Sequence, residues 1–183
     1  MKTLIKLNKE DIVQVLLNSL TILSDEETLN SLIRIITSIN YQIEDNSQNC
    51  FLKVFNSHEN ARFFGESLLR ILNFEEDKSS LYRILQCLID IIDSTKSSFF
   101  YSTDLESFIN IAIKKLESTY TDKLRFYILK VLERITFYDD YYKMKYKLDL
   151  LEELMENYEI NDEVDEENQK MATQILQNIK NHK

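Results

Sequence analysis

The amino-acid sequence predicts an all-α protein, an armadillo/HEAT-like α-solenoid of stacked antiparallel helix pairs, and three observations lead to this prediction. Apolar residues recur at three- and four-residue spacing along almost the whole chain, which is the period of an amphipathic helix. Proline is absent and Gly65 is the only glycine, whereas the tight turns between strands depend on these two residue types. Most connections between the apolar segments are short, and short connections place consecutive helices antiparallel.

The apolar stripes give the positions of the helices. We expect helices over 9–22, 25–39, 60–73, 78–93, 104–118, 121–136, 140–157 and 162–180, and a shorter helical segment over 49–56. Two stripes, 81–92 and 126–135, are apolar around more than half of the helix, which is typical of a helix with neighbours on both sides. This feature favours a layered solenoid with degenerate repeats over an isolated bundle. The whole chain, 1–183, is expected to form one domain.

Residues that start helices precede most of these stripes. Two pairs have the spacing of a capping box, in which both side chains bind backbone N–H groups at a helix start, and they are Ser24 with Glu27 and Thr103 with Glu106. Four further residues stand where an N-cap is expected, namely Asn8, Asp77, Thr121 and Asn161. The middle of the core is expected to contain Leu88, Ile109, Leu129 and Leu132.

The chain is acidic, with a formal net charge of −9. Nucleic-acid binding relies on Lys and Arg that neutralise phosphates, so this charge argues against a nucleic-acid partner and, for the same reason, against anionic membranes. No apolar stretch has the length of a transmembrane helix, and residues 1–7 are too few for a secretory signal. Cys50 and Cys87 lack metal or redox spacing and fit a reducing compartment. We therefore expect a cytoplasmic protein.

The sequence contains no recognisable catalytic constellation. His58 and His182 are its only histidines, and both are expected to be solvated surface residues. Gly-rich phosphate loops, zinc-binding histidine pairs and nucleophile elbows are absent from the sequence. The acidic segment 152–167 lacks the glycine and the alternating ligands of a calcium loop, so we interpret it as a solvated helix terminus. The sequence thus predicts no catalytic residue, no cofactor and no metal ligand.

Two further clusters have both a structural and a functional interpretation. The aromatic run 99–101 is expected to fill a corner between helix pairs rather than to bind a ligand. Lys143, Lys145 and Lys147 alternate with tyrosines, a pattern that superficially resembles a nucleic-acid patch. Because residues two apart on a helix point in different directions, contact with an acidic protein surface and a plain solvated face both stay open as interpretations.

Three segments within 64–135 resemble the leucine-rich, armadillo-like domain of the WISH/DIP family, which includes the NCK-interacting protein with an SH3 domain and its yeast relatives. A helix that ends in a Leu-Leu-Asn-type stop is similar to residues 64–73 (FGESLLRILN). A Phe-Tyr-Thr-Asn-Asp start followed by a long Ile/Val/Leu helix is similar to residues 99–117, where Ser-Thr-Asp replaces Thr-Asn-Asp. The next helix of the family, with Leu-Arg and Tyr-Leu-Arg-Val-Leu, is similar to residues 124–135.

The resemblance implies a function in actin nucleation. Members of the family bind the actin-related protein 2/3 complex and activate it without a pre-existing filament, so that the product is a linear filament. The resemblance therefore implies a protein-binding domain with this complex as its partner, actin as an indirect partner, and no catalytic site. A generic helical-repeat scaffold that docks a partner helix or peptide in a groove is the alternative from the residues alone, and an enzyme with an unrecognised site comes third.

A partner-binding surface on this chain should contain exposed cations, because the rest of the chain is acidic and a specific site needs local complementarity. The candidates lie on the predicted helix 121–136 and just beyond it, and they are Arg125, Lys130, Arg134, Lys143, Lys145 and Lys147. The sequence leaves the oligomeric state open, a homodimer included.

Overall fold

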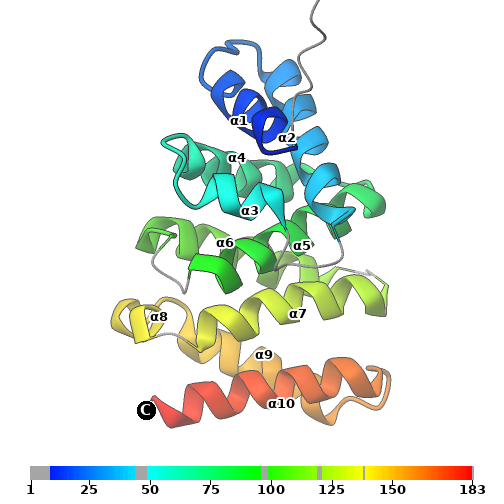
Figure 1. Cartoon of the computed structure of the whole chain (residues 1–183). Helices are drawn as coiled ribbons and strands as arrows, with labels where there is room; N and C mark the ends of the chain where they lie inside the picture. The colour runs from blue at the N-terminus through cyan, green and yellow to red at the C-terminus, as the bar shows by residue number, and fades with distance from the viewer. Residues whose placement is uncertain (1–8, 44–48, 96–98, 119–120, 138, 183) are drawn as a thin grey trace, which may run out of the picture.

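The computed structural model describes residues 9–43, 49–95, 99–118, 121–137 and 139–182. Over these residues the chain folds into ten helices and no strand, so the predicted all-α class is confirmed (Figure 1). The helices are α1 (Lys9–Ser19), α2 (Glu26–Tyr41), α3 (Cys50–Phe55), α4 (Ala61–Phe74), α5 (Lys78–Thr95), α6 (Ser102–Glu117), α7 (Asp122–Thr136), α8 (Asp139–Met144), α9 (Leu148–Ile160) and α10 (Glu166–Asn181).

Four helices, α2, α5, α7 and α10, follow one another in a row down the stack (Figure 1). Hydrogen bonds near their C-terminal ends join each helix to the next, from Asn40 to Asp90 at 2.6 Å, from Arg134 to Asp93 at 3.1 Å and from Asn178 to Thr136 at 3.3 Å. Near the N-terminal end of α7, the Asn168 side chain of α10 donates to the Asp122 carbonyl at 3.0 Å. Neighbouring helices in this row therefore run in the same direction.

A second row contains α4, α6 and α9. The Lys115 amine at the end of α6 donates to the carbonyl of Glu75 after α4 at 3.2 Å, and the Tyr158 hydroxyl of α9 donates to the Leu116 carbonyl at 3.0 Å. The partners in these two bonds are 40 and 42 residues apart, and the C-terminal bonds of the first row span 50, 41 and 42 residues. Each helix thus contacts its counterpart one helix pair further along the chain.

The core runs through the stack without a break, and α5 lies near its centre. This helix contacts α2, α3, α4 and α7, which explains why its apolar stripe is wider than one face. The four residues expected at the centre are all buried, with at most 1 % of their surface exposed, and that prediction is confirmed for Leu88, Ile109, Leu129 and Leu132.

The aromatic run 99–101 fills a corner beside α3 and α4, as predicted for its first two residues. The Phe99 ring lies with its centroid 5.1 Å from that of Phe55 and 4.9 Å from that of Phe100. Gly65 on α4 faces this cluster, and a Cβ atom at that position would lie 2.6 Å from Cε1 of Phe99. The third ring, Tyr101, is 54 % exposed and does not belong to the buried corner.

The start of α2 differs from the predicted capping box. The N-cap is Asp25, whose carboxylate accepts hydrogen bonds from the backbone N–H of Thr28 at 2.8 Å and from its hydroxyl. The box of Ser24 with Glu27 was therefore wrong by one residue. A carboxylate at the N-cap also faces the positive end of the helix dipole, which favours Asp over Ser at this position.

The start of α6 lies earlier than the predicted box of Thr103 with Glu106, which was also wrong. The N-cap is Tyr101, and its backbone N–H donates to the Asp104 carboxylate at 2.9 Å. The acidic member of the box is therefore the shorter Asp104, and Thr103 lies within the first turn.

The remaining predicted N-caps divide into three outcomes. Asp77 and Thr121 precede α5 and α7 as predicted. For α10 the prediction of Asn161 was wrong, because the N-cap is Asp165. Its Oδ1 accepts hydrogen bonds from the backbone N–H groups of Glu167 and Asn168, both at 3.1 Å. Asn8 lies outside the described residues.

The predicted helix 140–157 is interrupted, and two helices, α8 and α9, take its place. The break contains two lysines with left-handed backbone, Lys145 with φ 51° and Lys147 with φ 49°. Such angles end a helix, because L-residues in this region cannot continue right-handed hydrogen bonding. The Tyr141 hydroxyl donates to the Tyr146 carbonyl at 3.1 Å and so ties the turn to α8, a local side-chain contact that apolar spacing does not reveal.

Replacing Leu129 with Ala should lower the free energy of unfolding by about 2–5 kcal/mol, the range for emptying a packed leucine site. Urea denaturation of both proteins measures this difference. A change below about 1 kcal/mol would mean that the site relaxes around the smaller side chain or is less tightly packed than its complete burial indicates.

The change Gly65→Ala should destabilise the protein by about 1 kcal/mol, although Ala is the better helix former by about the same amount. The reason is that the new methyl group meets the Phe99 ring, which is itself held by Phe55 and Phe100. The control is the same change beside Phe99→Leu, where the smaller side chain should remove the penalty. Equal effects in both backgrounds would contradict the steric explanation.

Candidate partner-binding groove

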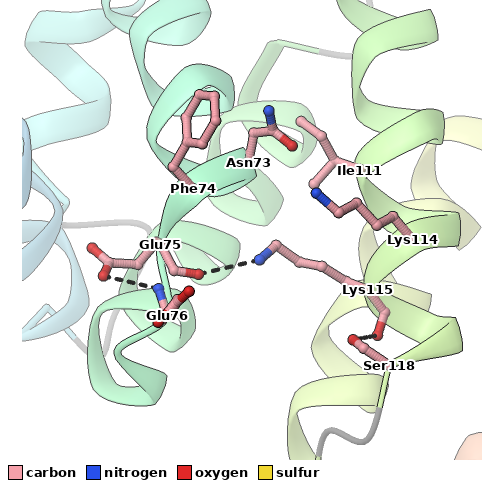
Figure 2. Close-up of a pocket in the computed structure, with 8 residues that line it drawn as sticks. All are labelled: Asn73, Phe74, Glu75, Glu76, Ile111, Lys114, Lys115 and Ser118. Carbon is pink, nitrogen blue, oxygen red and sulfur yellow. Dashed lines mark hydrogen bonds between the residues drawn. The ribbon is translucent and has the colours of Figure 1, made fainter.

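A groove runs between the C-terminal half of α4 and the adjacent face of α6. It consists of two adjoining hollows of about 290 Å³ and 230 Å³, which share Asn73, Phe74 and Ile111. Figure 2 shows the residues that line the first of them. The groove has both apolar and charged residues along it, as contact sites between proteins do, and it is therefore one candidate for a contact site.

Phe74 is the most prominent side chain of the groove, with 76 % of its surface exposed. It is the last residue of α4, because Glu75 turns to an extended backbone with ψ 131° while its N–H still donates to the Ile71 carbonyl. Leu69 and Ile111 line the groove and are almost completely buried. An exposed aromatic ring beside buried aliphatic side chains is suited to the apolar centre of a protein contact.

Three helices are tied together at one end of the groove by Glu75 and two cations. Lys115 is only 6 % exposed and donates to the Glu75 carbonyl, as the dashed line in Figure 2 shows. The Glu75 carboxylate accepts from Arg34 of α2 at 2.9 and 3.0 Å. These charges stabilise the packing of α2, α4 and α6, and so they are not available for chemistry on a ligand.

Electrostatics at Glu75 favour the ionised carboxylate. Burial by itself would raise its pKa, but the nearby Ser80 hydroxyl, the N–H of Asp77 and the Arg34 guanidinium outweigh this effect. The pKa is therefore held below the ordinary glutamate value of 4.5.

His58 is packed into the structure, so the prediction of a solvated surface histidine was wrong for it, whereas His182 is exposed as predicted. His58 is 9 % exposed, its Nδ1 accepts from the Asn60 backbone N–H at 3.1 Å, and its Nε2 lies 3.1 Å from Oδ1 of Asn18. His182 stacks on the Tyr142 ring at 4.0 Å. Spacing along the sequence gave no sign of these contacts, because their partners are about 40 residues away.

Neither histidine belongs to a metal-type cluster. Across the described part of the chain no three His, Cys, Asp or Glu side chains converge as metal ligands do. The acidic segment 152–167 covers the end of α9 and the start of α10, where Asp165 is the helix cap.

The predicted cations of α7 do not form one patch. Arg134 bonds to Asp93 and Glu133, and Arg125 bonds to Asp122, so both guanidinium groups are paired within the chain. Arg125 lies about half a turn out of phase with Arg134 and therefore on the other side of the helix. Lys130 is different, since its amine lies 5.9 Å from the centroid of the Phe126 ring.

The predicted lysines beyond α7 lie close to one another. Lys143 is near the end of α8, whereas Lys145 and Lys147 occupy the turn before α9, and all three are exposed. Because the backbone of this turn is left-handed at Lys145 and Lys147, the three lysines do not follow one regular helix as the sequence predicted.

The groove was not predicted from the sequence. Phe74 follows the Leu-Leu-Asn-type stop of α4 and lies outside the apolar stripe, and this position was the only available signal. An apolar side chain just past a helix stop has no core position to fill, so it is a better surface candidate than residues within a stripe.

Comparison with known families gives a match to the family described as SPIN90/Ldb17, leucine-rich domain, over residues 25–151. The chain belongs to this family. Because this is the WISH/DIP family, the resemblance seen in the three segments of 64–135 is confirmed and extends to α2 and α9. The matched residues include the whole α4–α6 groove, so this groove is part of the family domain. No helix in the described residues is long and apolar enough to cross a membrane.

The change Glu75→Gln should lower the free energy of unfolding near neutral pH by about 1 kcal/mol, since Arg34 is half exposed and its pairing is screened by solvent. Because the folded-state pKa is lowered, the carboxylate stabilises the fold fully above pH 4.5, and this contribution is lost as the pH falls below that value. Wild type and variant should therefore converge in urea denaturation below pH 4.5.

The control for this measurement is Glu76→Gln, which removes the same charge from the exposed neighbouring position. A stability difference between Glu75→Gln and wild type that stays constant down to strongly acidic pH would contradict the assigned role of the carboxylate.

Proposed function

We propose that this domain binds and activates the actin-related protein 2/3 complex, so that the complex nucleates a linear actin filament without a pre-existing filament. The observation that carries the proposal is membership of the SPIN90/Ldb17 leucine-rich domain family over residues 25–151. The domain acts by binding alone, and no catalytic step is assigned to its side chains. It works in the cytoplasm at the actin cytoskeleton, with actin as an indirect partner.

The scaffold for this activity is a single armadillo/HEAT-like solenoid that the whole chain builds. Support comes from contacts that recur at separations of 40, 41 and 42 residues, close to the roughly 40–47 residues of such repeats. Parallel packing of α5, α7 and α10 gives each helix the same kind of neighbour, which is the pattern of a stacked repeat. Such a stack presents a long surface of fixed shape to a partner.

Activation by a binding domain requires a difference in affinity between two arrangements of the partner. A domain that binds the active arrangement about tenfold more tightly shifts its population about tenfold, which corresponds to about 1.4 kcal/mol. A rigid surface suits this task because it does not adapt to the inactive arrangement. Here the polar contacts between successive helices and the continuous core supply that rigidity.

The contact residues proposed for the complex are cations on α7 and around α8, and the three lysines around α8 are the exposed ones among them. Lys130 and the three lysines around the α8–α9 turn provide positive charge on a chain of net charge −9. Arg125 and Arg134 belong to the same proposal. To bind the partner, each would have to break its ion pair within the chain and form one with a carboxylate of the partner.

A second candidate function is a generic helical scaffold that docks a partner helix, and the exposed Phe74 in the α4–α6 groove favours it. A single assay distinguishes the two candidate functions. Only the activator changes the rate at which actin monomers polymerise in the presence of the purified complex.

The test is fluorescence-monitored polymerisation of actin monomers with the purified complex and without added filaments. The domain should shorten the lag, and the doubly reversed variant Lys143→Glu with Lys147→Glu should associate more slowly and bind more weakly. The loss should be larger at low salt, where Coulomb attraction between exposed charges is less screened.

A matched control is Lys53→Glu with Lys180→Glu, which changes the net charge equally at exposed positions on α3 and α10. This control should keep most of the wild-type activity. If the wild-type domain at saturating concentration neither binds the complex nor changes the lag, the activator function is wrong and the scaffold is the better description.

A further inference from the structure

The solvent-facing sides of α5 and α7 together carry a cluster of aromatic rings and cations. The α7 members are spaced by three, four and seven positions and so share one side of that helix. We refer to the cluster as the aromatic–basic face, which consists of Tyr82, Lys123, Phe126, Tyr127 and Lys130, with Arg83 bordering it next to Tyr82 on α5. The Tyr127 ring joins the helices, with its centroid 5.6 Å from that of Tyr82 and 6.1 Å from that of Phe126.

The two lysines of this face contact rings instead of carboxylates. The Lys123 amine lies 5.1 Å from the Tyr82 ring centroid, and the Lys130 amine lies 5.9 Å from that of Phe126. Within the described ranges neither lysine forms an ion pair, although arginines elsewhere on the chain do. An ammonium group over a ring keeps its N–H donors available to an incoming anion.

Arg83 is also without a carboxylate among the residues that the structure describes. Its Nη1 donates weakly to the Ser79 hydroxyl at 3.4 Å, and its Nε is buried without a hydrogen-bond partner. The guanidinium is not paired within the described part of the chain, so its Nη groups can pair with a carboxylate of another molecule.

The carboxylates around the face are bound within the chain and do not neutralise it from outside. Asp122 pairs with Arg125 and Asp93 with Arg134, each at 3.1 Å. Beneath the face, Asp90 is 3 % exposed and accepts from the Gln86 amide at 2.8 Å. The charge that the face presents to solvent is therefore positive.

The tyrosine hydroxyls add neutral donors to this face. Burial raises the pKa of Tyr127, and Tyr41, Tyr82 and Asp90 raise it further, so this phenol stays protonated at neutral pH. Tyr41, the last residue of α2, is 43 % exposed and extends the aromatic surface to α2.

We propose that the aromatic–basic face is a binding surface for an acidic segment of a protein partner, with carboxylates on the cations and apolar side chains on the rings. Charge complementarity selects this occupant, since the face is positive on a chain of net charge −9. Aromatic residues and arginine also dominate the energetically important centres of protein interfaces. The partner's identity rests on the proposed function, whereas the binding chemistry does not.

Fluorescence anisotropy with defined probes tests the proposal on the full chain. The acidic probe is a labelled peptide of four Glu-Glu-Leu-Phe repeats, and the second probe carries Gln in place of every Glu. The third probe is single-stranded oligothymidine of 16 nucleotides. Wild-type protein should bind the acidic peptide at least about tenfold more tightly than the Gln peptide, with an affinity that falls as salt rises.

Two variants locate the binding. Lys123→Gln with Lys130→Gln removes the two charges that lie on the rings, and this variant should bind the acidic peptide about tenfold more weakly. Lys53→Gln with Lys180→Gln removes equal charge elsewhere and should bind as wild type does. Arg83→Gln should also weaken binding. Because Arg83 is half-buried, the melting temperature of this variant is measured as well. The lysine pair tests the proposal independently of any folding defect in the Arg83 variant.

Three outcomes would overturn the proposal: equal binding of the acidic and Gln peptides, unchanged binding in the Lys123 and Lys130 variant, or tighter binding of oligothymidine than of the acidic peptide. The last outcome would identify a nucleic-acid surface. The assay contains no actin and no actin-related protein 2/3 complex, so its result is separate from that of the polymerisation test. Peptide binding with an unchanged lag would support this face and reject the activator function.

Discussion

The burial of α5 and α7 from more than one side is the constraint on which the rest of the structure depends. Each of these helices separates two neighbours of its own row and also packs against the second row. A fully buried Leu or Ile contributes about 1.5–3 kcal/mol relative to an exposed one. Because both helices are apolar around most of their circumference, they are stable only when the helices before and after them are already in position. The end pairs are therefore as necessary as the centre.

The distribution of charge follows from this arrangement. Arg34, Arg125 and Arg134 pair with carboxylates of the same chain and fix neighbouring elements, and the buried Lys115 binds a backbone carbonyl. Lys123 and Lys130 lie on aromatic rings of α5 and α7, and Lys145 and Lys147 lie in the turn before α9.

The helical content and the central core could be predicted from the sequence because they depend on local spacing alone. Leu88 and Leu129 are buried for the same reason that their stripes are visible in the sequence. Contacts between residues about 40 positions apart could not be predicted in this way, and they determine the burial of His58. The caps show an intermediate case, since Asp25 and Ser24 both suit the position and only the exact backbone turn selects between them.

The candidate site was predictable only in part. Lys130 lies on a solvent-facing side as the sequence suggested, but the pairing of Arg125 and Arg134 depends on carboxylates in the folded arrangement, some of them from other segments. Phe74 gave a weak signal, because its exposure depends on where α4 stops and how α6 lies beside it. Family membership was carried by core-packing segments, which identify the fold well and the contact surface poorly.

The hydrogen bond from Asn40 to Asp90 has a mechanical consequence. It joins α2 and α5 inside the core, where water cannot replace either partner. If one helix slid past the other by a turn, the buried Asp90 carboxylate would keep its bond from Gln86 but lose the one from Asn40, at a cost of roughly 1–3 kcal/mol. The bond thus opposes sliding of α2 along α5. A relative movement of α2 and α5 that keeps this bond is therefore a change of tilt between the two helices and not a displacement along their axes.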